Sequence, residues 1–182
     1  MIEMVTGDYR EFFVALAGAV GALTGLLFVA LSLTPRSTPT LANPVVRQVR
    51  ASAALIAFTN TLAVSLFGLV PDTNIGYPSA VMGLIGTLFT AAGIRSLLAS
   101  LSTARQRLRQ LGLVNLLLLI FGVELVCGVL VITDRATTTP MHLIGYALAA
   151  SVLVGVARAW EMVGDRDTGL IASIATLIEH RS

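Results

Sequence analysis

Glu124 is an acidic residue inside a long apolar run, and its chemistry needs explaining first. The run extends from Leu111 to Ile132, and Glu124 lies eight residues before its end, about 12 Å along a helix axis at 1.5 Å per residue. A charged carboxylate at that depth in hydrocarbon is costly, and such acids usually face protein or water. Removal from water also favours the neutral, protonated carboxyl group. We therefore expect Glu124 to have polar partners.

Depth along the other apolar runs suggests which groups could meet Glu124. Asn60 lies ten residues before the end of the run from Ala51 to Val70, at a similar level. Hydroxyl groups at about this depth belong to Thr59, Thr61, Thr87 and Ser151. Together with Glu124 and Asn60 they form the predicted intramembrane polar site. Asn115 is nine residues before Glu124 and about half a turn out of phase at 100° per residue, so it points elsewhere.

Two interpretations of this polar site remain open. In the structural one, neutral Glu124 hydrogen-bonds Asn60 or a backbone carbonyl and holds two helices together. In the functional one, Glu124 binds a proton or cation in a pathway across the membrane. A single acid without a second one nearby favours the structural interpretation.

Motifs of soluble enzymes are missing from the sequence. It has no GxxxxGK[ST] phosphate loop, no GxGxxG and no HExxH, and no GxSxG nucleophile elbow. Two histidines and one cysteine, Cys127, are too few for a transition-metal cluster or an intrachain disulfide. We therefore expect no enzymatic activity, no metal and no cofactor.

The composition indicates a membrane environment. Hydrophobic residues make up 55% of the chain and charged residues 12%, about half the charged share usual for soluble domains. The mean hydropathy is +0.86. A soluble protein this apolar could not cover its surface with polar groups, whereas lipid tails solvate apolar side chains directly.

Five stretches approach the roughly 20 apolar residues that a membrane-spanning helix needs. They are Phe12 to Leu33, Ala51 to Val70, Tyr77 to at least Ile94, Leu111 to Ile132, and Met141 to about Trp160. The predicted fold is all-α, an integral membrane bundle of five transmembrane helices in one domain of residues 1–164. A four-span chain is the main alternative, because Arg95 and several hydroxyl residues blur the end of the third stretch.

Arginine collects on alternate connections, which predicts the orientation of the chain. The two basic connections contain no acid, and their arginines are Arg36, Arg47, Arg50, Arg95, Arg105, Arg107 and Arg109. The positive-inside rule places these connections in the cytoplasm, with the N-terminus outside the plasma membrane and the C-terminus inside. Anionic lipid headgroups, rather than nucleic acid, are the expected partners of Arg47, Arg50, Arg105, Arg107 and Arg109.

Small residues recur at helical spacing on three of the apolar runs. Lipid provides no hydrophobic drive for pairing helices, so close packing depends on such residues. The predicted packing positions are Gly18, Gly21 and Gly25 in the first run, Ser79, Gly83, Gly86, Thr90 and Gly93 in the third, and Ser151 and Gly155 in the fifth. Packing within one chain is the simpler interpretation of each stripe, and a homo-oligomer interface is the alternative.

Residues 165–182 differ from the rest of the chain. Their apolar residues recur at helical spacing and are Leu170, Ile171, Ile174, Leu177 and Ile178. The pattern predicts a short amphipathic helix at the cytoplasmic interface or against a partner. Alternatively, this segment extends the fifth helix into water.

The first apolar run, FFVALAGAVGALTGLLFVALSL, and the Ala159-Trp160-Glu161 end of the fifth resemble segments of small uncharacterised multi-span membrane proteins of high-GC Gram-positive bacteria. That group has no assigned activity, so the resemblance implies only a similar layout. The sequence favours a non-enzymatic membrane protein, either a self-associating oligomer or an accessory subunit of a larger membrane complex. A small channel or carrier that uses Glu124, and a lipid-binding or lipid-handling protein, are the alternatives.

Overall fold

The structure of the protein is a computed structural model that describes residues 7–33, 44–100, 104–133 and 139–163. These ranges contain five α-helices and no strand. The helices are α1 (Gly7–Leu33), α2 (Pro44–Gly68), α3 (Gly76–Ser100), α4 (Ala104–Thr133) and α5 (Thr139–Val163). Each is long and apolar enough to cross a membrane. The predicted all-helical fold is confirmed, with five candidate spans rather than four.

Helices α2 and α4 begin before their apolar stretches do. Helix α2 begins at Pro44, where a fixed φ suits the first helical turn and a missing N–H costs nothing. Helix α4 begins at Ala104, seven residues before the predicted stretch, with Ala, Arg, Gln and Leu, which all favour helices. Hydropathy marks where a helix is apolar and not where it ends, so the predicted bounds missed these polar turns.

A tight connection joins α2 to α3. The Leu69 and Val70 amides donate to Leu66 and Phe67 carbonyls, which closes the end of α2. Asp72 then takes a left-handed conformation with φ of 59°. The Asn74 side-chain oxygen accepts a hydrogen bond of 2.9 Å from the Gly76 amide, which satisfies a free donor at the start of α3. The short turn forces α2 and α3 to run antiparallel.

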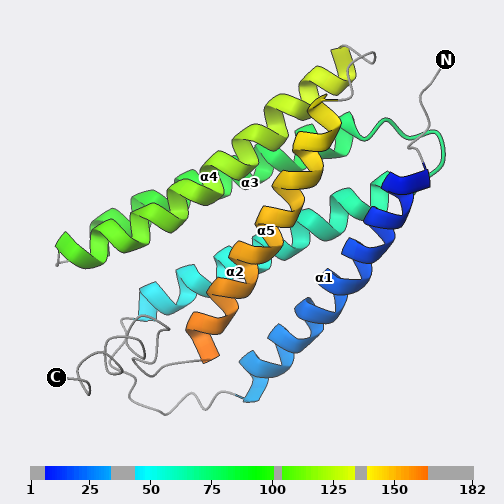
Figure 1. The fold of residues 1–182 in the computed structure, drawn as a ribbon. Coiled ribbons are helices and arrows are strands. Elements are labelled where there is room, and N and C mark those ends of the chain that lie inside the picture. Colours follow the sequence, from blue (N-terminus) through cyan, green and yellow to red (C-terminus); the bar gives the residue numbers. More distant parts are fainter. Residues whose placement is uncertain (1–6, 34–43, 101–103, 134–138, 164–182) are drawn as a thin grey trace, which may run out of the picture.

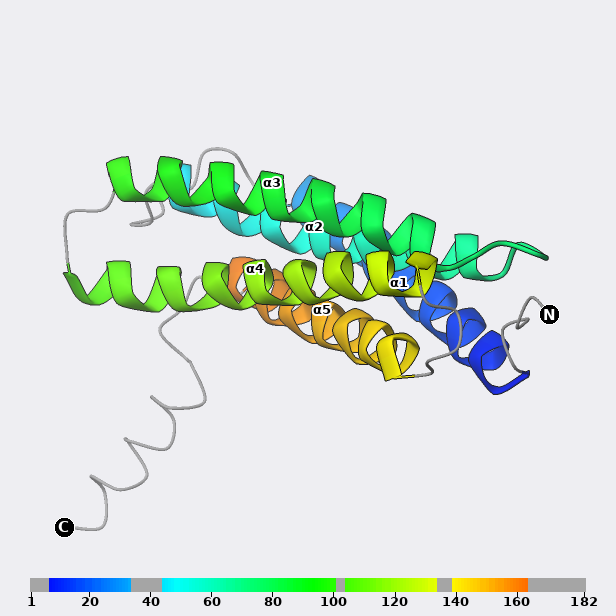
Figure 2. The same cartoon turned by 90° about the horizontal axis from the view of Figure 1, so that it is seen from above.

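The helices run alternately up and down the bundle, as Figures 1 and 2 show from two sides. Helix α2 packs against α1, α3 and α5, while α4 packs against α3 and α5. Helix α1 lies at the edge of the bundle, mainly against α2. We call one end of the bundle the arginine end, because it gathers the starts of α2 and α4 and the ends of α3 and α5. The start of α1 lies at the opposite end.

Glycines bring the backbones of α3 and α4 into direct contact. A Cβ atom on Gly83 would lie 2.6 Å from the Leu125 backbone nitrogen, and one on Gly128 would lie 2.5 Å from the Ala80 backbone nitrogen. Any side chain at either position would therefore separate the two helices. This contact positions α4, which carries Glu124, against the rest of the bundle.

Candidate functional site

Glu124 and Asn60 form a hydrogen-bonded pair in the centre of the bundle. Asn60 Nδ2 on α2 donates to Glu124 Oε2 on α4 across 2.7 Å. Both side chains are 0% exposed. The two bonded residues are 64 positions apart in the sequence, and their hydrogen bond joins α2 to α4.

Both residues occupy positions that apolar residues fill elsewhere along the same helix face. On α2 the buried residues on this face are Ala53, Ala57, Asn60 and Val64. On α4 they are Val114, Leu117, Phe121, Glu124 and Cys127. The steps of three and four residues place each set on one stripe. The packing of these stripes carries Asn60 and Glu124 into an otherwise apolar core.

Helix α5 contacts α2 at Thr61, which lies next to Asn60. The Thr61 hydroxyl is buried and lies 3.1 Å from the Ala57 carbonyl oxygen on its own helix and 3.4 Å from the Leu148 carbonyl oxygen on α5. Ser151, also 0% exposed, follows Leu148 by one helical turn. Helices α2, α4 and α5 therefore meet at the level of the Asn60–Glu124 pair.

The other predicted members of the polar site lie apart from this pair. Thr59 is exposed on α2, because neighbouring helix residues point about 100° apart and Asn60 and Thr61 take the inward directions. Thr87 is half-buried on α3. Within the described chain, Thr87 Oγ1 and Ser151 Oγ make no hydrogen bond. The structure thus brings together Asn60 and Glu124, with Thr61 beside them.

Each residue of the pair has one acceptor oxygen without a hydrogen-bond partner. Glu124 Oε1 and Asn60 Oδ1 are both enclosed and have no hydrogen-bond partner among the described residues. Buried oxygens of this kind are uncommon, because the loss of hydration is not compensated. The pair therefore makes one of the two hydrogen bonds that its atoms allow.

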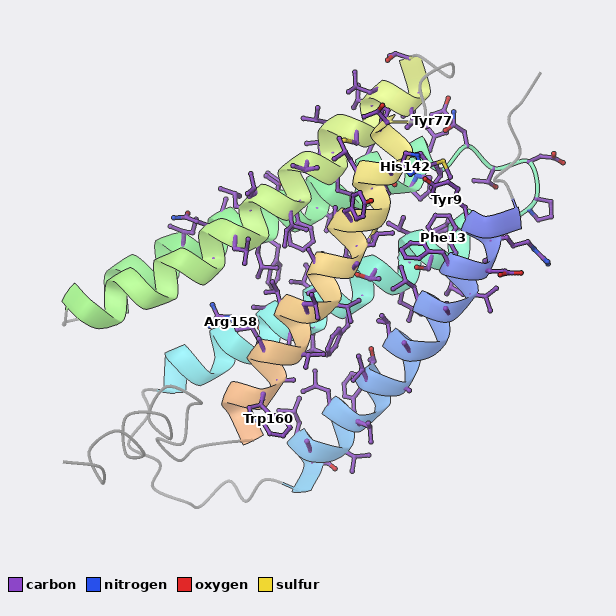
Figure 3. All side chains as sticks on the ribbon, viewed as in Figure 1. Tyr9, Phe13, Tyr77, His142, Arg158 and Trp160 are labelled. Atoms are coloured by element: carbon purple, nitrogen blue, oxygen red, sulfur yellow. The ribbon has the colours of Figure 1, made fainter. Side chains whose placement is uncertain are left out.

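Arg158 is a buried residue whose place the sequence interpretation missed. Its position near the inner end of the fifth run predicts a side chain that reaches the membrane surface, but the structure buries it to 1% exposure on α5. It follows Ser151 by seven residues and Val154 by four, so it shares their inward stripe. Figure 3 shows it projecting from α5 on the side away from α1. Helical phase was the signal that could have placed it. Trp160 is 75% exposed.

A second contact missed from sequence joins the first turns of α1 and α5. Tyr9 Oη and His142 Nδ1 are hydrogen-bonded, and their rings lie 5.6 Å apart. Figure 3 shows both side chains close to Phe13 at the end of the bundle opposite the arginine end. His142 is exposed. The two residues are 133 positions apart, and no local sequence pattern predicts such a contact.

The small-residue stripes divide into two kinds. On α3, Ser79 and Thr90 are buried, Gly83 meets α4, and Gly86 packs on the Phe121 ring, whereas Gly93 has nothing within 4 Å. On α5, Gly155 packs on the Phe58 ring of α2. In contrast, Gly18, Gly21 and Gly25 of α1 are exposed, and a Cβ atom added to any of them would meet nothing within 4 Å. The predicted packing of these three glycines within the chain is wrong for the described bundle.

The remaining predicted positions are placed only in part. The backbones of Arg47, Arg50, Arg105, Arg107 and Arg109 lie near the starts of α2 and α4, at the arginine end. Their side chains and the predicted tail helix of residues 165–182 lie outside the described residues. Among the residues that the structure describes, no three His, Cys, Asp or Glu side chains are grouped as a metal site would require.

Comparison of the chain with protein-family models, curated proteins and solved structures gives no match. The resemblance to membrane proteins of high-GC Gram-positive bacteria stays a prediction.

Proposed function

We propose that this chain is a non-enzymatic plasma-membrane protein that self-associates through the outward face of α1. That face is defined here by Gly18, Gly21, Ala22 and Gly25, all of them exposed. The observation that carries the proposal is the contrast between helices. Several glycines of the other helices, among them Gly83, Gly128 and Gly155, meet neighbouring side chains or backbone, and those that meet nothing (Gly93, Gly112 and Gly122) do not form a stripe. The three glycines on α1 meet nothing and lie on one stripe.

The orientation of α1 supports this proposal. The helix buries Phe13, Val20 and Leu27 against the bundle. The middle of its outward side carries small residues, with exposed Val14 before them and exposed Phe28 after them. Small faces allow the close backbone contact on which helix association in lipid depends. A second helix can fill the shallow outward face of α1 more closely than flexible lipid tails can.

Charge at the start of α1 fits a second copy of the same chain. Arg10 and Glu11 are exposed, and at 100° per residue they lie about 50° to either side of the glycine line. All copies enter a membrane in one orientation, so two α1 helices pair in parallel. A two-fold axis then places Arg10 of one copy opposite Glu11 of the other, twice.

The proposed topology has the N-terminus outside and the C-terminus in the cytoplasm. The arginine end is then cytoplasmic, in keeping with the positive-inside rule, and Arg47, Arg50, Arg105, Arg107 and Arg109 are available to anionic headgroups. The tail helix of residues 165–182 is proposed to lie at that same surface. If the chain is instead an accessory subunit of a larger complex, the same face of α1 is proposed to bind a helix of a different protein.

Dilution of fluorescent protein in liposomes tests self-association. We expect wild-type copies to colocalise at low protein-to-lipid ratios, and the double variant Gly21→Leu/Gly25→Leu to weaken association by about tenfold or more, equivalent to about 1.4 kcal/mol. The matched control is Gly112→Leu, at an exposed glycine of α4 that also has nothing within 4 Å. Wild-type protein that stays monomeric at every ratio, or an equal effect of Gly112→Leu, contradicts the proposal. A foreign subunit that co-purifies with wild type and is lost from the double variant favours the accessory role.

A further inference from the structure

The unsatisfied atoms of the Asn60–Glu124 pair point to a ligand. Asn60 Nδ2 already donates to Glu124 Oε2, and the two oxygens without partners are Glu124 Oε1 and Asn60 Oδ1. Both are acceptors, so they cannot satisfy each other unless a hydrogen is placed between them. One added proton supplies the donor that a hydrogen bond between them needs.

The charge balance of the core leads to the same conclusion. A buried carboxylate needs a counter-charge or a proton. Among the described ionisable side chains of the helices packed around the pair, Tyr77, His142 and Tyr146 are exposed. Cys127, one turn from Glu124, is buried and supplies no positive charge. Arg158 lies ten residues beyond Leu148, the level at which α5 meets Thr61, which is about 15 Å along α5. No opposite charge is described beside Glu124.

We propose that Glu124 is a proton-binding site, in which Oε1 carries the proton and donates it to Asn60 Oδ1. The proton adds to the carboxylate, an O–H bond forms, and no other bond breaks. Asn60 and Glu124 are then joined by two hydrogen bonds, as a carboxylic acid and a primary amide pair in apolar surroundings. This inference is independent of α1 and of self-association.

A proton fits the pair better than a metal ion does. Hard cations take six or more oxygen ligands in a spacious site. The pair offers two free oxygens, enclosed among apolar residues that include Ala57 and Phe121. A proton needs only one oxygen to carry it and one to accept it.

Infrared spectroscopy of the protein in lipid tests the proposal directly. A protonated carboxyl group has a C=O stretching band that ionised carboxylates lack. We expect this band in the wild type at neutral pH and its loss in Glu124→Gln, which keeps the shape of the side chain and both hydrogen bonds. The exchange variant Asn60→Asp/Glu124→Gln places the acid on α2 and the amide on α4, and we expect the band to return.

The control and the contradicting results are distinct. Glu11→Gln removes an exposed acid of α1 and leaves the band unchanged. Absence of the band in the wild type, or its persistence in Glu124→Gln, overturns the proposal. Stabilisation of the wild type by Na⁺ or K⁺ that is lost in Glu124→Gln also overturns it, because the site then holds a cation.

Discussion

At the scale of single residues, the Asn60–Glu124 bond is a specific tie in a core that is otherwise held by shape. Lipid tails are as apolar as leucine, so burial of apolar groups does not distinguish a neighbouring helix from lipid. A polar pair does distinguish a neighbouring helix from lipid, because each partner loses its hydrogen bond when the helices separate. The bond therefore selects the register of α2 against α4.

Substituting Asn60→Leu should destabilise the bundle by about 1–3 kcal/mol, since Glu124 is left buried without a partner. The measurement is unfolding in detergent followed by circular dichroism. The control is Asn115→Leu, an exposed position on α4, where a change within about 0.5 kcal/mol is expected. Equal effects of the two substitutions would show that the buried pair contributes nothing specific.

The residue scale also shows where sequence reasoning succeeds and where it stops. Depth along each apolar run led to the hypothesis that Asn60 meets Glu124, and the structure has that bond. Depth along the helix could not show that Thr59 is exposed or that Arg158 is buried. The direction in which each side chain points around the helix decides whether it is buried. The Tyr9–His142 contact depends on how α1 and α5 lie in space, which local sequence does not contain.

At the scale of helices, α3 and α4 form the closest pair in the described bundle. Their glycines let the backbones touch, and a methyl group on Gly83 would lie 2.6 Å from a backbone nitrogen of α4. Backbone cannot move aside as a flexible side chain can. The stripe of small residues predicted this type of contact, but its partner helix became known only from the fold.

The substitution Gly83→Ala should lower the free energy of unfolding by about 1–3 kcal/mol through overpacking. Gly93→Ala on the same helix meets no atom within 4 Å, so it should be neutral or stabilise by up to about 1 kcal/mol through helix propensity. Comparison of the two unfolding curves removes the shared effect of exchanging glycine for alanine in α3. A destabilisation of similar size at both positions would contradict the close contact.

At the scale of the whole molecule, the structure has five candidate spans, and in the proposed topology this odd number places the two ends of the chain on opposite sides of the membrane. The five spans followed from hydropathy, because hydrocarbon thickness sets the length of each run. The outward position of the α1 glycines could not be predicted from the sequence. A glycine stripe looks the same whether its partner is a helix of the same chain or of another copy. The arrangement of the neighbouring helices shows that no described residue of this chain covers those glycines, and a second copy is the proposed partner.

Tags placed at the two termini should be labelled from opposite sides of the membrane in intact cells. The N-terminal tag is expected to react with an impermeant reagent, and the C-terminal tag only after permeabilisation, because the arginine end is proposed to be cytoplasmic. Reversed accessibility would refute the orientation. Both tags on one side would refute an odd number of spans.

The most direct test of self-association is disulfide cross-linking between copies in native membranes. Cys127 is the chain's one cysteine and is first replaced in Cys127→Ser. Ala22→Cys then places a thiol on the outward face of α1, and Leu119→Cys places one on α4, where Leu119 is 63% exposed. The account predicts a cross-linked dimer with Ala22→Cys and little with Leu119→Cys. Monomer alone with Ala22→Cys, or equal cross-linking at both positions, would contradict an interface on α1.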